Sequence, residues 1–215
     1  MGESKQTFRG CEDLVYAHIL KDNNTDGENE GYVTGPVLPL AGLGSVGKTT
    51  EVASGTTYFD NAPADTIQSE GSDEVTLLTA VVDLKTLGDI LGKGVDEATG
   101  AFMDGPADPP YVAVGYKLGL SDGTKRLVWR LKGKFGIPDE SAETINDGTD
   151  TQSQELKYTG VATTHEFAKP KAQGKSGKQK ALVVDERDGL ADTSKFFDEV
   201  TTIDTLPAKS ASPGA

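Results

Sequence analysis

The sequence predicts a mainly β protein, a sandwich or barrel of roughly eight strands with one short helix at its side. Three observations support this fold class. Hydrophobic residues make up only 35% of the 215 residues, whereas 26 glycines and 10 prolines are spread along the chain, and this balance favours short strands and turns over long helices. Short apolar segments recur between turn signals without a repeat period. Only one segment has the spacing of an amphipathic helix, so a helical bundle is disfavoured.

The N-terminal part of the chain is expected to be extended. An apolar run at 14–20 precedes a dense turn signal and predicts the first strand. The stretch 32–43 contains Pro36 and Pro39, which cannot donate to a ladder, so it is expected to be an edge or bulged strand. Residues 44–74 are mostly Gly, Ser, Thr, Asp and Glu and predict a long loop or a ragged hairpin. Because loops of this length in compact domains are usually functional, 44–74 is a candidate contact segment.

The only predicted helix follows a buried strand at 75–82, which is rich in β-branched residues. It covers about residues 83–91. Its apolar side chains at helical spacing are Leu84, Leu87, Ile90 and Leu91. Asp83 is expected to be the N-cap and Gly92 the first residue beyond the C-terminus, so the helix should pack its apolar face on a sheet.

A β-hairpin is predicted from two extended segments, 111–120 and 125–135, joined by a turn. The second segment alternates strictly. One face is expected to hold Leu127, Trp129, Leu131 and Phe135, and the other Arg126, Arg130, Lys132 and Lys134. The four cations are interpreted either as a solvated face or as a candidate subunit interface that meets the acidic surface of a neighbour.

The C-terminal part contains two more predicted strands. In order, the segments are a polar linker at 138–155, a strand at 156–167, a lysine-rich loop at 169–180, a strand at 181–184 and a flexible tail at 207–215. The loop holds five lysines and no acid, which predicts an exposed, mobile segment. Residues 1–206 are expected to form one domain.

The net charge is −13, from 34 acidic and 21 basic residues. A protein this acidic is not expected to clamp nucleic acid, because phosphate binding needs clustered Lys and Arg. Residues 1–100 hold 17 acids and 6 bases, and residues 101–215 hold 17 acids and 15 bases. Most of the net negative charge therefore lies in the first half of the chain. No apolar run is long enough to span a membrane and no secretory signal opens the chain, so folding in a cytoplasm is expected.

Residues 42–49 match the phosphate-binding pattern G-x-x-x-x-G-K-[ST] through Gly42, Gly47, Lys48 and Thr49. A phosphate-binding loop needs a helix directly after it, because the helix N-terminus supplies part of the anion site. The following segment is rich in β-branched residues and contains a glycine, so it is a poor helix former. The match is interpreted as accidental, and no nucleotide cofactor is expected.

A second motif reproduces the first half of a calcium-binding loop, with Asp22, Asn24 and Asp26 at the ligand positions. The position of the bidentate glutamate is occupied by Val33, so the motif is interpreted as a turn and no metal is expected. His18 lies in an apolar strand and is expected to be a core or interface residue. No set of residues forms a recognisable catalytic constellation, so the protein is not expected to be an enzyme.

A series of short segments together resembles a known family. In chain order they are 14–17, 32–37, 40–42, 57–61, 81–84, 89–92, 104–116 and 126–135. Their order and spacing resemble those of the major tail proteins of bacteriophages with long non-contractile tails, in the group often called the phi13 type. The resemblance covers about residues 8–205.

The resemblance implies a tail-tube β-sandwich with a flanking helix. Such subunits close into hexameric rings that stack into a hollow tube in the virion, through which the genome is ejected. Implied partners are other copies of the chain, a tape-measure protein in the lumen, and tail terminator and tail-tip or baseplate proteins, with genomic DNA only in transit and no membrane. Assembly would take place in the bacterial cytoplasm. Segment 44–74 is then the candidate for reaching the next ring, and an acidic lumen would repel DNA.

Two other classes of protein are compatible with the sequence. A related β-rich tail-tip, binding or adhesin module would be a monomer or trimer with a ligand-binding loop face. A phosphate-binding-loop protein would have a helix after Thr49 and bind ATP, which binding of labelled ATP and Mg²⁺ can test.

Overall fold

The computed structural model describes residues 6–24, 31–59, 62–140 and 153–209. The protein is mainly β, as the sequence predicts. The described strands are β1 (Phe8–Asn23), β2 (Gly31–Thr34), β3 (Leu38–Ala41), β4 (Leu43–Phe59), β5 (Ala62–Thr79), β6 (Gly94–Val95), β7 (Phe102–Met103), β8 (Val112–Leu120), β9 (Lys125–Phe135), β10 (Gln154–Gly160) and β11 (Ala181–Asp185). The helices are α1 (Leu84–Leu91), α2 (Ala168–Ala172) and a 3-10 turn at Glu186–Asp188.

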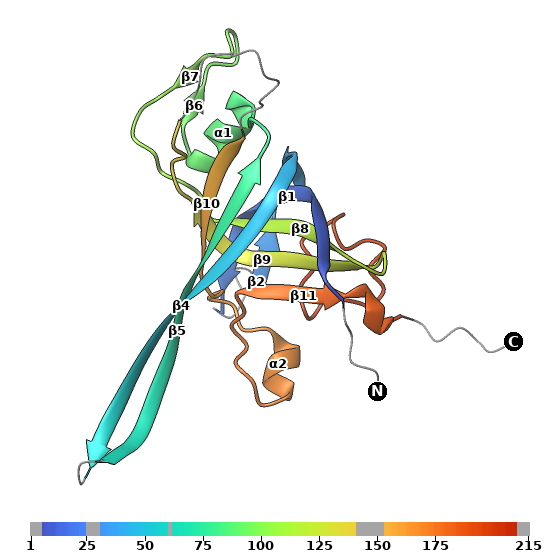
Figure 1. Cartoon of the computed structure of the whole chain (residues 1–215). Helices are drawn as coiled ribbons and strands as arrows, with labels where there is room; N and C mark the ends of the chain where they lie inside the picture. The colour runs from blue at the N-terminus through green and yellow to red at the C-terminus, as the bar shows by residue number, and fades with distance from the viewer. Residues whose placement is uncertain (1–5, 25–30, 60–61, 141–152, 210–215) are drawn as a thin grey trace, which may run out of the picture.

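Nine of the strands form one antiparallel sheet in the order β2-β1-β8-β9-β10-β5-β4, with β3 also paired to β1 and β11 to β9. The sheet divides at β9. One edge of β9 pairs with β8, whereas the other pairs with β11 through residues 126–130 and with β10 through residues 133–135. Strands β10, β5 and β4 therefore turn away from β11 (Figure 1).

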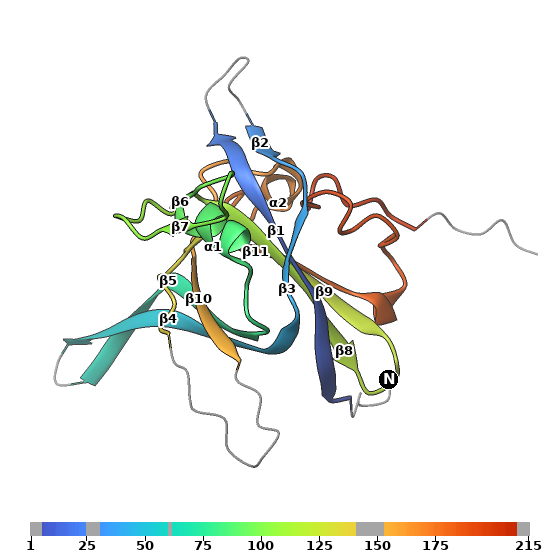
Figure 2. The same ribbon diagram turned by 90° about the horizontal axis from the view of Figure 1, so that it is seen from above.

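The central strands β1, β8 and β9 are covered on both faces. The first core packs beneath β5, β10 and α1 and includes Tyr16, Leu77, Ile90, Val114, Val128 and Leu156. The second core lies under the C-terminal segment and includes Trp129, Leu131, Phe167, Leu182, Phe196 and Val200. Because side chains alternate along a strand, neighbouring residues of β8 and β9 enter opposite cores. The C-terminal segment lies across the sheet from α1 in Figure 2.

Helix α1 confirms the predicted boundaries and caps. The carboxylate of Asp83 accepts a hydrogen bond from the backbone N–H of Thr86, and Gly92 ends the helix in the left-handed conformation with φ of 64°. A side chain at position 92 would also collide with the backbone of Asp108. Ile90 and Leu91 are buried, whereas Leu84 is half exposed, so the contact face lies toward the C-terminal turn of the helix.

The predicted 32–43 strand is divided at Pro36 into β2 and β3, and β2 lies at the edge of the sheet as expected. The segment 44–74, expected to be a long loop or a ragged hairpin, forms a two-stranded β-hairpin made by β4 and β5. Its distal part projects from the rest of the protein (Figure 1). We call the described residues of 49–74 the arm and the remaining described residues the body.

The strand predicted at 156–167 ends at Gly160, because the chain beyond it leaves the sheet and bonds with the end of β1. The lysine-rich segment begins with α2, whose first amides, on Ala168 and Lys169, donate to the carboxylate of Asp204. Residues 207–209 of the expected tail pair with 190–192, whereas 210–215 lie outside the described residues. Most of the 138–155 linker also lies outside them.

Candidate functional site

The residues of the phosphate-binding pattern lie at the start of β4. Gly47, Lys48 and Thr49 pair with Thr76, Val75 and Glu74 of β5. The strand continues to Phe59, so a helix N-terminus does not follow Thr49. The ammonium group of Lys48 lies 3.5 Å from the carboxylate of Asp73. These residues therefore build the root of the arm in the structure.

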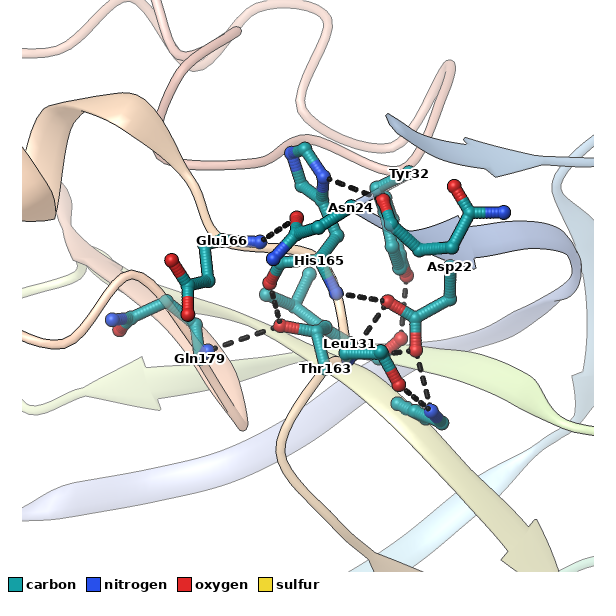
Figure 3. Close-up of polar contacts among 11 residues, drawn as sticks. Asp22, Asn24, Tyr32, Leu131, Thr163, His165, Glu166 and Gln179 are labelled. Carbon is teal, nitrogen blue, oxygen red and sulfur yellow. Dashed lines mark hydrogen bonds and ion pairs between the residues drawn. The ribbon is translucent and has the colours of Figure 1, made fainter. Parts of the chain in front are cut away.

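The half calcium-loop motif lies at the end of β1. The carboxylate of Asp22 accepts hydrogen bonds from the backbone N–H of Thr164 at 2.9 Å and of His165 at 2.7 Å, and from the ammonium group of Lys132 (Figure 3). The side-chain oxygen of Asn24 accepts from the N–H of Glu166 at 2.8 Å (Figure 3). Asp26 lies outside the described residues. Asp22 and Asn24 thus hold the segment after β10 against β1, and we call this contact the latch.

The carboxylate of Asp22 in the latch is stabilised in its charged form by the groups that donate to it. Burial raises the pKa of Asp22, but the N–H of His165 and the ammonium group of Lys132 outweigh it, so the pKa lies below its ordinary value. Asp22 is therefore an anion at neutral pH and accepts charge-assisted bonds, which are stronger than neutral ones. In the sequence, the turn signal and the half calcium-loop motif marked this region, but neither indicated its partners at 164–166.

The cationic face predicted for β9 is used within the chain. Arg126 bonds to Asp185 at 2.9 Å and Lys132 to Asp22, while the ammonium group of Lys134 lies 4.7 Å from the ring centre of Tyr111. The expectation of a solvated cationic face was wrong for Arg130, which is only 9% exposed.

The predicted apolar face of β9 was also partly wrong. Leu127, Trp129 and Leu131 share the second core, but Phe135 enters the first. The register against β8 shifts between Val112 and Val114, which introduces an irregularity in β9 and reverses the alternation beyond it.

Arg130 belongs to a buried ion cluster at the root of the arm. The carboxylate of Asp73, which is 2% exposed, lies 3.1 Å from Arg130, 3.5 Å from Lys48 and 3.5 Å from Lys180. It also accepts a hydrogen bond from the hydroxyl of Thr50 at 2.9 Å. We call these five residues the root cluster. It joins both arm strands to β9 and to the segment before β11.

The root cluster holds Asp73 in its charged form. Burial raises the pKa of Asp73, but the Thr50 hydroxyl and the cations Lys48, Lys180 and Arg130 together lower it below the ordinary value. A buried carboxylate with several donors is costly to leave unpaired. A change in the direction of the arm would separate Asp73 from its cations and leave buried charges unpaired. The root cluster therefore fixes the direction in which the arm leaves the body.

Beyond the root cluster, the arm has no cover within the described chain. Described side chains at 51–56 and 66–70 are exposed, on both faces of the ladder. Two of them are large and apolar: Val52 is 58% exposed and Ile67 is 64% exposed. Among the described strands, β4 pairs only with β5, so its other edge offers unpaired backbone groups.

His18 lies at the contact between β1 and α1. Its Nε2 atom is 2.7 Å from the carboxylate of Asp89, which also accepts a hydrogen bond from the hydroxyl of Tyr16 at 2.7 Å. Asp89 and Tyr16 line a cavity of about 520 Å³ beside α1. These contacts attach α1 to the sheet, and the expectation that His18 is a core or interface residue agrees with its partly buried position within the chain.

Among the described residues, no three His, Cys, Asp or Glu side chains gather as a metal site would require. None of the described helices has the length and apolar content needed to cross a bilayer. Comparison with protein-family models and with curated proteins finds no match to the chain. The arm, with its exposed faces, and the root cluster that orients it are thus the features with the clearest functional implication.

Proposed function

We propose that the protein is a structural subunit of a phage tail tube, which assembles with copies of itself into stacked hexameric rings that form the conduit for genome ejection. The proposal combines the family resemblance of the sequence with one structural observation, the arm. An arm that extends from a well-packed body, with both faces and, beyond Asp73, both outer strand edges unpartnered in the described chain, suits a subunit whose remaining burial is supplied by a neighbour.

The energetics of the arm support this proposal. An isolated two-stranded hairpin is at best marginally stable in water, because it buries little apolar surface. The arm also carries an exposed strand edge, and such edges are templates for pairing with another chain. A neighbouring subunit that covers Val52, Ile67 and the edge of β4 would stabilise the arm and remove the risk of uncontrolled association.

The net charge of −13 agrees with a conduit for DNA. An acidic wall repels phosphate and does not retain the passing genome. The structure supports this reading indirectly, because Arg126, Arg130 and Lys132 are paired with carboxylates of the same chain and do not form a free basic surface. The proposed partners remain a tape-measure protein, a tail terminator and tail-tip or baseplate proteins, and the proposed location is the virion.

Negative-stain electron microscopy of the purified protein over a range of concentrations tests the proposal. Long tubes of uniform width, built from six-fold rings, are the expected result. A protein that stays monomeric or trimeric at the highest concentrations would contradict it and would favour the related tail-tip or binding module. Sedimentation velocity on the same samples distinguishes a monomer from a trimer.

A further inference from the structure

The two faces of the arm differ in how their charges are used. Thr50 and Asp73 point toward Arg130, and we call their side of the ladder the inner face. Glu70 lies on this side too, since Lys180 contacts both Glu70, at 2.7 Å, and Asp73. The inner-face carboxylates are thus neutralised within the chain.

The opposite side, the outer face, carries two carboxylates without a cation. Side chains alternate along a strand, so Ser72 and Glu74, the neighbours of Asp73 in β5, point away from the root cluster. Glu51 lies where the register of β4 and β5 shifts, and its carboxylate accepts a hydrogen bond from the hydroxyl of Ser72 at 3.4 Å, which places it on the same outer side. Glu51 and Glu74 are exposed, and neither forms an ion pair with a described residue. Glu74 pairs with Thr49, two positions from Glu51, so both carboxylates lie on one short stretch of the outer face.

The lysine-rich segment has the opposite imbalance. Residues 168–180 contain five lysines and no acid. Lys180 serves the root cluster, and Lys171 pairs with Glu166 at 3.1 Å. Lys175 and Lys178 are exposed and form no side-chain bond with a described residue. Two exposed lysines of this segment, Lys175 and Lys178, are therefore available to a second chain, whereas Arg126, Arg130 and Lys132 of β9 are paired within their own chain.

The geometry points to a contact between copies, and we propose that the outer face of the arm, at Glu51 and Glu74, binds the lysine-rich segment 168–180 of a second copy. The lysine-rich segment of the same chain cannot reach the outer face while the root cluster is intact, because Lys180 holds this segment against the inner face. Complementary charges select the partner and the register, while the exposed apolar residues of the arm supply burial.

This contact joins two different surfaces of the same chain. Such head-to-tail interfaces close into rings when the rotation between copies allows it, and otherwise generate filaments. The inference deepens the proposed function, on which the choice of a second copy rests, by naming the surface that receives the arm. In Figure 1 the arm and α2 extend to the same side of the body. A rotation about an axis along that direction therefore leaves the arm of one copy at the same height as α2 of the next.

Two charge-reversed variants test the contact. Glu51→Lys with Glu74→Lys gives a chain with two cationic surfaces, and Lys175→Glu with Lys178→Glu gives a chain with two anionic surfaces. Each variant alone should require an about tenfold higher concentration to form tubes, equivalent to about 1.4 kcal/mol. An equimolar mixture should assemble near the wild-type concentration, because alternating copies restore both pairings.

Matched controls change the net charge equally at other exposed positions. They are Lys85→Glu with Lys195→Glu, and Glu97→Lys with Glu140→Lys. The controls should assemble like the wild type, alone and in mixtures. Circular dichroism verifies that all variants are folded.

The inference is overturned if the wild type forms tubes and the two reversed variants assemble as well as their controls, or if their mixture assembles no better than either variant alone. If the wild type forms no tubes, sedimentation velocity of the same mixtures decides. Charge-dependent association of copies would then support the contact while the proposed function fails, and no association between any copies would overturn both.

Discussion

The body and the arm belong to one β-sheet but are stabilised in different ways. Strands β8 and β9 are buried on both faces, between the first and second cores. Strands β4 and β5 share the first core only near their body ends, whereas the described side chains at 51–56 and 66–70 are exposed. The difference shows that backbone pairing shapes the arm without a core of its own, and that the root cluster joins it to the packed body. A neighbouring copy, as proposed, would add the burial that the arm lacks.

The largest effect is expected from Trp129→Ala, which removes a fully buried side chain from the second core. Trp129 packs against Phe197 and donates from its indole N–H to the carbonyl of Phe196 at 2.8 Å. Its loss should reduce the free energy of unfolding by about 3–5 kcal/mol. Urea denaturation followed by circular dichroism measures it, and a loss below about 1 kcal/mol would show that the second core is not well packed.

A comparable loss is expected from Asp73→Asn, because the variant leaves Arg130 buried without its carboxylate. Removal of one partner of a buried ion pair costs about 3–5 kcal/mol. Proteolysis of the arm should also become faster, since the root cluster no longer fixes its direction. Glu74→Gln, which neutralises the adjacent exposed carboxylate, is the control and should change neither quantity.

Asp73 should also make the free energy of unfolding depend on pH. The pKa of Asp73 is lower in the folded protein than its ordinary value of 3.8. Its ionised form therefore stabilises the fold above the unfolded pKa, and this stabilisation is lost as the pH falls below about 4 through the folded value. Urea denaturation between pH 6 and about pH 3 should show a smaller loss in Asp73→Asn than in the wild type. Equal losses would show that other carboxyls dominate.

A smaller effect is expected at the latch. Asp22→Ala leaves the N–H groups of Thr164 and His165 without an acceptor and should reduce stability by about 1–3 kcal/mol. Amide hydrogen exchange should rise at these two positions and remain unchanged in β8. Unchanged exchange at Thr164 and His165 would mean that the latch does not hold the segment.

The smallest effect on folding is expected in the arm. Ile67→Ser replaces a side chain that is 64% exposed and should change the free energy of unfolding by less than about 0.5 kcal/mol. The same substitution should reduce tube formation, because it removes apolar surface that a neighbour would bury. A strongly destabilised monomer would show that the arm packs on its own body.

Local signals explain which elements were predictable. Helix α1 was predicted with its caps because Asp83 and Gly92 act within a few residues. The burial of Arg130 was not predictable, because its partner Asp73 lies 57 positions away and strand alternation alone places charged residues in solvent. Likewise, the latch joins Asp22 to amides 142 and 143 positions away. The arm was recognised as an unusual segment by composition, but its regular pairing depends on the whole register of β4 and β5.

The most direct test of the role of the arm in assembly is a variant in which residues 53–69 are replaced by Asn-Gly. Val52 and Glu70 are paired across the hairpin, so a two-residue turn can join them. The shortened protein should have a free energy of unfolding within about 0.5 kcal/mol of the wild-type value but form no tubes in electron micrographs. Tubes equal in number and width to those of the wild type would contradict this role.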